Sequence, residues 1–178
     1  MKLRVRKGFF SWKLVNESGE TEAKISNLKF IGAAKKISDA QGRVIFTTDI
    51  INLPMQKENW NYADTRKYII YKDSNPIATA NLSFAKNPER TKVQTFFFRP
   101  PQVDKMNIET PYGIWSIQRQ KNNGLMITFG GVQLGSVTPF FTFKPIYLKL
   151  TGKYEVAFWA GIYTLIEYMM HEDDLIVV

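Results

Sequence analysis

The chain has 178 residues, of which 44% are hydrophobic and 14% aromatic, and it contains no cysteine. This composition excludes a disordered chain, a disulfide scaffold and a thiolate metal site, and the length fits one domain over residues 1–178. The formal net charge is +8, and residues 1–36 carry nine Lys or Arg against three Glu. This excess indicates an anionic partner such as a membrane surface or nucleic acid, and the alternative is a surface charge that serves only solubility.

The first residues predict a two-faced strand. Lys2, Arg4 and Arg6 alternate with Leu3 and Val5. Because successive side chains of a strand point to opposite faces, one face is basic and the other apolar. Further strands are predicted in the first third of the chain at 9–15, 21–26, 28–37 and 43–47.

The second part of the chain continues the same pattern of short strands and turns. Asp73-Ser74-Asn75 and Asn122-Asn123-Gly124 each predict a hairpin turn, and Pro100-Pro101 ends a strand. Gly130, Gly131 and Gly135 predict bulges or close backbone approach. The strands predicted here are 67–72, 76–84, 93–98, 112–119, 125–129, 132–137 and 140–148, which gives about ten to twelve in the whole chain.

The end of the chain predicts one helix, over about 155–171, that is apolar on all sides. Between Val156 and Met170 the one charged residue is Glu167. Such a helix is buried in protein or in lipid. Fifteen residues span only about 22 Å, against about 30 Å for a hydrocarbon core, and Glu167 is costly there, so a membrane span is disfavoured. The predicted fold is therefore mainly β, a closed antiparallel barrel of about 12 strands that encloses the hydrophobic C-terminal helix.

Two features of the sequence suggest a known family. One is the order of strands followed by a hydrophobic terminal helix, VAFWAGIYTLIEYMM, and the other is the pair of hairpins at 37–43 and 68–73. The chain resembles the tubby C-terminal-like superfamily, which includes the LURF-one-related and phospholipid scramblase-like proteins. The resemblance covers essentially the whole chain as an architectural pattern, and it implies a twelve-stranded barrel around a central helix. It also implies binding of phosphoinositide headgroups by basic side chains of the barrel surface, although no position here is matched to that site. The cysteine cluster, proline-rich extension and acidic calcium loop of scramblases are lacking.

Catalytic and metal-binding motifs are not found in the sequence. There is no Gly-rich phosphate loop, nucleophile elbow or HExxH motif, so we expect neither an enzyme nor a cofactor. His171 is followed by three acids at 172–174, a pattern typical of a solvated tail, so no metal site is expected. Nucleic acid is not an expected partner, because the one predicted helix is buried.

The basic face of the first strand is the candidate anion-binding or lipid-binding site. It consists of Lys2, Arg4 and Arg6, extended by Lys7, Lys13, Lys35 and Lys36 if the first strands pair. Anionic lipid attracts such cations. The alternative is a charged strand that prevents aggregation.

The loop at 53–65 is the second candidate surface. Trp60 and Tyr62 there either cap the open end of the barrel or insert at a membrane or partner surface. The leading hypothesis is thus a non-catalytic, cytoplasmic, tubby-like module, peripheral at a membrane of anionic phospholipid, with no transmembrane segment. The alternative is a protein-interaction or structural domain that uses the 53–65 loop.

Overall fold

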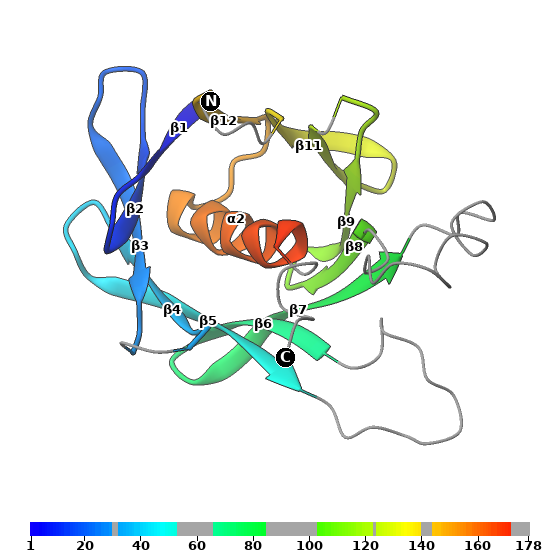
Figure 1. Cartoon of the computed structure of the whole chain (residues 1–178), viewed down its shortest axis with the longest axis horizontal. Coiled ribbons are helices and arrows are strands. Elements are labelled where there is room, and N and C mark those ends of the chain that lie inside the picture. The colour runs from blue at the N-terminus through cyan, green and yellow to red at the C-terminus, as the bar shows by residue number, and fades with distance from the viewer. Residues whose placement is uncertain (30–31, 53–65, 85–102, 123, 140–143, 172–178) are drawn as a thin grey trace, which may run out of the picture.

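Twelve antiparallel strands close into a barrel around one helix in the computed structural model, which describes residues 1–29, 32–52, 66–84, 103–122, 124–139 and 144–171 (Figure 1). The strands are β1 (Lys2–Lys7), β2 (Ser11–Val15), β3 (Thr21–Asn27), β4 (Lys35–Asp39), β5 (Val44–Asn52), β6 (Arg66–Lys72), β7 (Asn75–Phe84), β8 (Val103–Thr110), β9 (Gly113–Arg119), β10 (Leu125–Phe129), β11 (Val132–Val137) and β12 (Ile146–Leu150). The helix is α2 (Val156–Met170).

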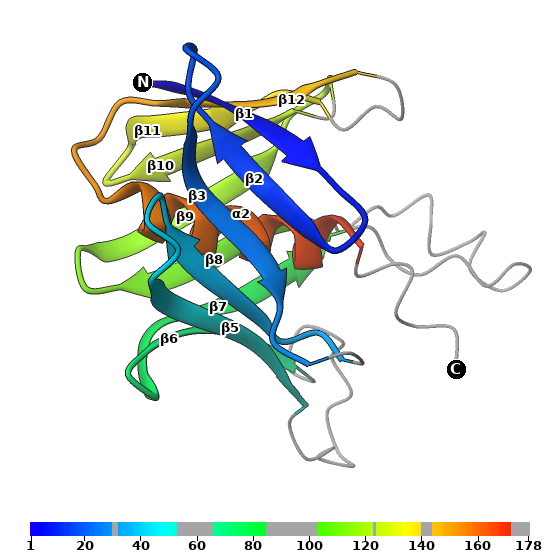
Figure 2. The same ribbon diagram turned by 90° about the vertical axis from the view of Figure 1, so that its left-hand side faces the viewer.

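Each strand pairs with its neighbours in sequence, and the pairing of β1 with β12 closes the barrel. Leu3 stands opposite Leu148, and Val5 stands opposite Ile146, so that the closure joins the two ends of the chain. Closure leaves no edge strand open to pairing with another molecule. We call the end at which α2 begins the base of the barrel, and the end at which α2 ends, beside the β1–β2 turn, its mouth (Figure 2).

The helix α2 lies along the barrel and fills it (Figures 1 and 2). Every residue from Ala157 to Met169 is buried. Gly161 lets the helix approach the wall closely, since a Cβ added to it would lie 3.0 Å from Ile70 Cδ1 and 3.5 Å from Ile37 Cδ1. The inner face of the wall supplies the other half of the core, because alternate strand residues point inward.

Aromatic rings fix the helix at the base, and hydrogen bonds fix it at the mouth. The Trp115 ring lies 5.7 Å from that of Phe158 and 5.1 Å from that of Trp159. At the other end the Tyr168 hydroxyl donates to the Ala33 carbonyl over 2.6 Å and lies 2.9 Å from the Thr48 hydroxyl. Both ends of the helix are therefore tied to the wall.

The predicted barrel, its strand number and the C-terminal helix are confirmed. The strands predicted at 9–15 and 28–37 begin later than predicted, since residues 9–10 form a turn and residues 28–29 and 32–34 are not in a strand. In the described part of the strand predicted at 140–148, the strand begins at Ile146. The strand β8 was not predicted. The predicted strand at 93–98 and the whole loop at 53–65 lie outside the described residues. Within the described parts of the chain, no helix has the length and hydropathy needed to cross a bilayer.

The close contact at Gly161 yields a first prediction. Gly161→Leu places a branched side chain against Ile70 and Ile37, and overpacking of this kind costs about 1–3 kcal/mol. We expect the free energy of unfolding, measured by urea titration, to fall by at least that amount. Val156→Leu, at the half-buried start of α2, is the matched control and should change it by less than about 1 kcal/mol. Equal stability of the two variants would contradict tight packing at Gly161.

Candidate functional site: a basic pocket on the outer wall

The outer face of β1 carries three cations in a row. Leu3 and Val5 point into the core, so Lys2, Arg4 and Arg6 point outward. The sequence folds this way because only the apolar set can face α2. The basic set is therefore displayed on the outside of the barrel.

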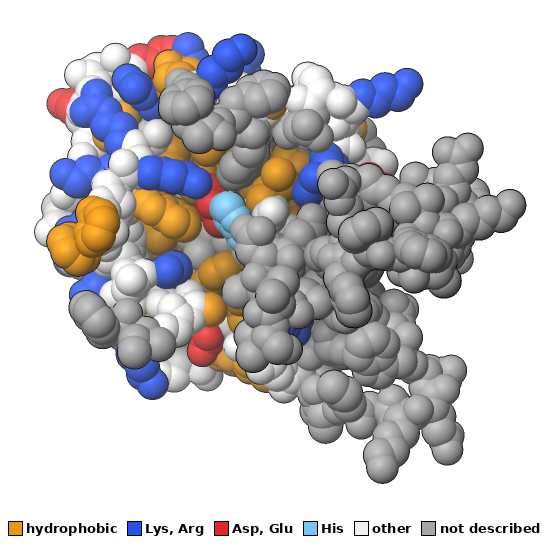
Figure 3. All heavy atoms as spheres, in the orientation of Figure 1, with side chains coloured by type: hydrophobic (Ala, Val, Ile, Leu, Met, Phe, Trp, Pro, Cys, Tyr) orange, Lys and Arg blue, Asp and Glu red, His pale blue; other side chains and the backbone are white. Residues whose placement is uncertain are grey.

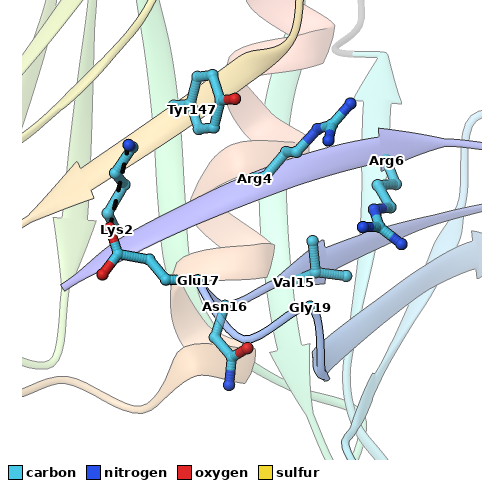
Figure 4. Close-up of a pocket in the computed structure, with 8 residues that line it drawn as sticks. All are labelled: Lys2, Arg4, Arg6, Val15, Asn16, Glu17, Gly19 and Tyr147. Carbon is cyan, nitrogen blue, oxygen red and sulfur yellow. Dashed lines mark ion pairs between the residues drawn. The ribbon is translucent and has the colours of Figure 1, made fainter.

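These cations line a hollow of about 320 Å³ (Figure 4). Its other lining residues come from β12 and from the end of β2 with the β2–β3 turn; they are Tyr147, Val15, Asn16, Glu17 and Gly19. Tyr147 stands opposite Arg4 across the β1–β12 pair, and Val15 stands opposite Arg4 across the β1–β2 pair. Three strands and one turn thus build the pocket.

Asn16 of the β2–β3 turn binds two acids beside the pocket, Glu20 of the turn and Glu22 of β3. The Asn16 side-chain amide donates to Glu20 Oε2 over 2.9 Å and to Glu22 Oε1 over 2.7 Å, and its oxygen accepts from the Glu20 backbone N–H. Gly19 adopts a φ of +87°, which suits a glycine in this tight turn. Glu17 remains as the one carboxylate among the lining residues.

The pocket is left electropositive. Lys2 Nζ lies 4.0 Å from Glu17 Oε1, a solvent-exposed pair that contributes little stability, and 4.9 Å from the Tyr147 ring centroid. Among the described residues, neither Arg4 nor Arg6 has an ion-pair partner. Two guanidinium groups are therefore available to an anion, which their planar donors can bind in a bidentate manner.

Cations of the pocket stand directly opposite cations of the neighbouring strands. Arg6 stands opposite Lys13, Lys13 stands opposite Lys24, and Lys2 stands opposite Lys149. Like charges directly opposite each other destabilise a sheet. The fold itself does not require this arrangement, whereas binding of an extended anionic surface would benefit from it.

A different charged cluster lies inside the mouth, on the inner face of the barrel (Figure 3). The carboxylate of Glu167, on α2 and only 3% exposed, pairs with Lys7 Nζ at 2.9 Å and lies 3.4 Å from His171 Nε2. The Tyr163 hydroxyl donates to the same carboxylate. Glu167 thus lies near the mouth of the barrel and pairs with a lysine.

The surroundings of Glu167 favour its ionised form. Burial acts to raise its pKa, but the hydrogen bond from His171, the charge of Lys7 and the hydrogen bond from Tyr163 outweigh burial, and the pKa lies below the ordinary value. Burial, together with the Glu167 charge, raises the pKa of Tyr163. Burial lowers the pKa of Lys35, against the opposing effect of the Glu167 charge. The Glu167 carboxylate is therefore a buried charge that its neighbours compensate.

The seven predicted basic residues are thus divided between two faces. Lys2, Arg4 and Arg6 share the pocket, and Lys13 and Lys36 lie on the outer face of β2 and β4. Lys7 and Lys35 instead face inward at the mouth, on the same strand faces as Val5 and Ile37.

The other sequence-based candidates give no site in the described structure. Trp60 and Tyr62 lie outside the described residues. Within the described ranges, no group of three or more His, Cys, Asp or Glu side chains could hold a metal ion. The sequence reasoning missed Tyr147, because its position opposite Arg4 follows only from closure of the barrel.

Comparison of the chain with protein-family models, with curated proteins and with solved structures gave no match.

The Glu167 cluster yields a prediction about pH. Since the folded-state pKa of Glu167 is lower than in the unfolded chain, its stabilisation is present above the ordinary value of about 4.5 and is lost as the pH falls through the folded-state pKa. Glu167→Gln should therefore reduce the difference in free energy of unfolding between pH 7 and pH 3. Glu109→Gln, at an exposed position of β8, is the control and should retain that difference. Parallel pH profiles for Glu167→Gln and the wild type would contradict this account.

Removal of the lysine tests the same pair from the other side. Lys7→Met leaves the buried carboxylate of Glu167 with fewer partners. We expect the free energy of unfolding at pH 7 to fall by about 1–3 kcal/mol. This is less than for a fully buried pair, because Lys7 is partly exposed. Urea denaturation measures the loss. Lys67→Met, at an exposed position of β6, should change the stability by less than about 0.5 kcal/mol.

Proposed function

We propose that this chain is a non-catalytic binding module with a tubby-like barrel, and that the basic pocket on its outer wall binds anionic membrane lipid. The observation that carries the proposal is the pair Arg4 and Arg6, two guanidinium groups without an ion-pair partner among the described residues, in a hollow of about 320 Å³. The twelve-stranded antiparallel barrel with its C-terminal helix is compatible with the tubby C-terminal-like superfamily.

The shape and charge of the pocket suit a phosphorylated headgroup. Arginine recognises phosphate through paired N–H donors, and Lys2 adds a third cation at the rim. Each basic side chain near an anionic membrane surface contributes about 1 kcal/mol of attraction. The cross-strand cations Lys13, Lys24 and Lys149 widen the positive area beyond the pocket, as contact with a surface of many headgroups requires.

The arrangement also supports binding rather than catalysis. The pocket contains no histidine, and its single carboxylate, Glu17, lies beside Lys2. The buried acid Glu167 is on the other side of the wall and is held ionised by its partners. The 53–65 loop lies outside the described residues, so the proposal that it captures a protein partner stays a prediction from the sequence.

Vesicle binding tests the proposal. We expect the protein to co-sediment with vesicles in proportion to their content of anionic lipid, and the bound fraction to fall as NaCl is raised, since salt screens the attraction. Lys2→Glu/Arg4→Glu/Arg6→Glu should weaken binding by at least about tenfold. Circular dichroism checks that the variant keeps its fold.

A matched triple separates the pocket from net charge. Lys67→Glu/Lys72→Glu/Lys121→Glu reverses three exposed lysines away from β1. Each change of Lys or Arg to Glu lowers the formal net charge by two, so that both triple variants carry +2 in place of +8. The control should retain most of the binding, and an equal loss in both triples would refute a role for the pocket.

A further inference from the structure

The turn between β1 and β2 ends in two exposed phenylalanines. The Gly8 N–H donates to the Ser11 carbonyl over 2.9 Å, so that Phe9 and Phe10 form the tip of the hairpin. Phe9 is 96% exposed and Phe10 is 76% exposed, the highest values of any large hydrophobic residue that the structure describes. Their rings meet edge to face with centroids 4.9 Å apart.

The fold does not account for these two residues. Hairpin tips favour Gly, Asn and Asp, which suit turn geometry and water, and aromatic residues bring neither advantage. The turns between β10 and β11, with Gly130-Gly131, and between β6 and β7, with Asp73-Ser74, follow the ordinary preference. A pair of phenylalanines in water at such a position indicates contact with an apolar phase.

Cations surround this tip at the mouth of the barrel. Lys13 is exposed on β2. Lys7 and Lys35, which face Glu167 inside the mouth, place their Nζ atoms 5.1 Å and 5.7 Å from the ring of Trp12, next to the tip. Exposed Lys29 lies in the β3–β4 connection, which is at the same end of the barrel (Figure 2). Aromatic residues with lysines around them are typical of a segment that enters the headgroup region of an anionic bilayer.

The tip also lies on the same wall as the basic pocket. Strand β1 runs from the base to the mouth, with Arg4 and Arg6 on its outer face and the turn directly after Lys7 (Figure 2). Lys7, the last residue of β1, lies about 3 Å beyond Arg6 at the strand rise, and the turn with Phe9 and Phe10 follows directly. A flat bilayer laid against this wall therefore meets the pocket and the tip together.

We propose that Phe9 and Phe10 insert into the interfacial region of the anionic bilayer that the basic pocket binds, so that the β1–β2 hairpin anchors the barrel on its side. This inference rests on the proposed function, to which it adds the anchor and the orientation. The pocket supplies electrostatic attraction, and the tip supplies burial of apolar surface, which salt does not screen.

A fluorescent label at the tip tests the insertion. Because the chain has no cysteine, Phe9→Cys and Ile114→Cys each give one site for an environment-sensitive NBD label. Ile114 is 63% exposed on β9 near the base, away from the proposed contact. With phosphatidylserine vesicles, we expect a blue shift of the label at position 9 and quenching by lipids that carry a nitroxide on the acyl chain. The label at position 114 should show neither change.

Co-sedimentation supplies the second readout. Phe9→Ser/Phe10→Ser should weaken vesicle binding by at least about tenfold, because the variant has no apolar side chains at the tip to transfer from water into the bilayer. The binding that remains should be abolished by NaCl. Ile114→Ser/Val132→Ser, at positions that are 63% and 66% exposed, is the matched control and should bind as the wild type does.

The outcomes separate this inference from the proposed function. Vesicle binding without a shift or quenching at position 9 would overturn the inference and leave lipid binding by the pocket intact. Absence of binding by the wild type would overturn both. A wild-type dimer that Phe9→Ser/Phe10→Ser converts to a monomer without vesicles, measured by sedimentation velocity, would show that the tip joins two copies of the chain, and would also overturn the inference.

Discussion

The packing of an apolar helix inside a closed β-barrel is the constraint on which the rest of the structure depends. Twelve strands enclose more space than their own inner side chains fill, and α2 occupies that space from the base to the mouth. The absence of a side chain at Gly161 lets α2 lie close to Ile70 and Ile37 of the wall. With the interior filled, binding is left to the outer wall and the mouth.

The same constraint gives β1 two separate tasks. Its inward residues Leu3 and Val5 pack in the core, and Lys7 at its end neutralises the buried carboxylate of Glu167. Its outward residues form the basic pocket. A register slip of one residue would exchange the two sets, which would place arginine against the helix. The core therefore fixes which cations reach the surface.

Two features of this wall oppose stability and solubility, and the anionic bilayer that we propose as the partner would account for both. Cations stand directly opposite one another at Arg6, Lys13 and Lys24, where folding alone would favour opposite charges. Phenylalanines occupy the adjacent hairpin tip, where turn geometry would favour glycine or asparagine. Departures of this kind from local rules are expected where function is served. In the proposed binding mode, electrostatic attraction and membrane anchoring would lie on one side of the barrel.

The sequence by itself determined the strand-rich pattern, the outward set on β1 and the buried helix, because each follows from a short-range periodicity of apolar and polar residues. It did not reveal β8, because the buried residues Val103, Met106 and Ile108 are unevenly spaced and do not alternate regularly with polar residues. A shift in register between β8 and β7 accommodates this spacing. Nor did it separate Lys7 and Lys35, which face Glu167, from the cations of the outer wall. Only the tertiary structure decided that Tyr147 stands opposite Arg4, because that contact exists only when the last strand pairs with the first.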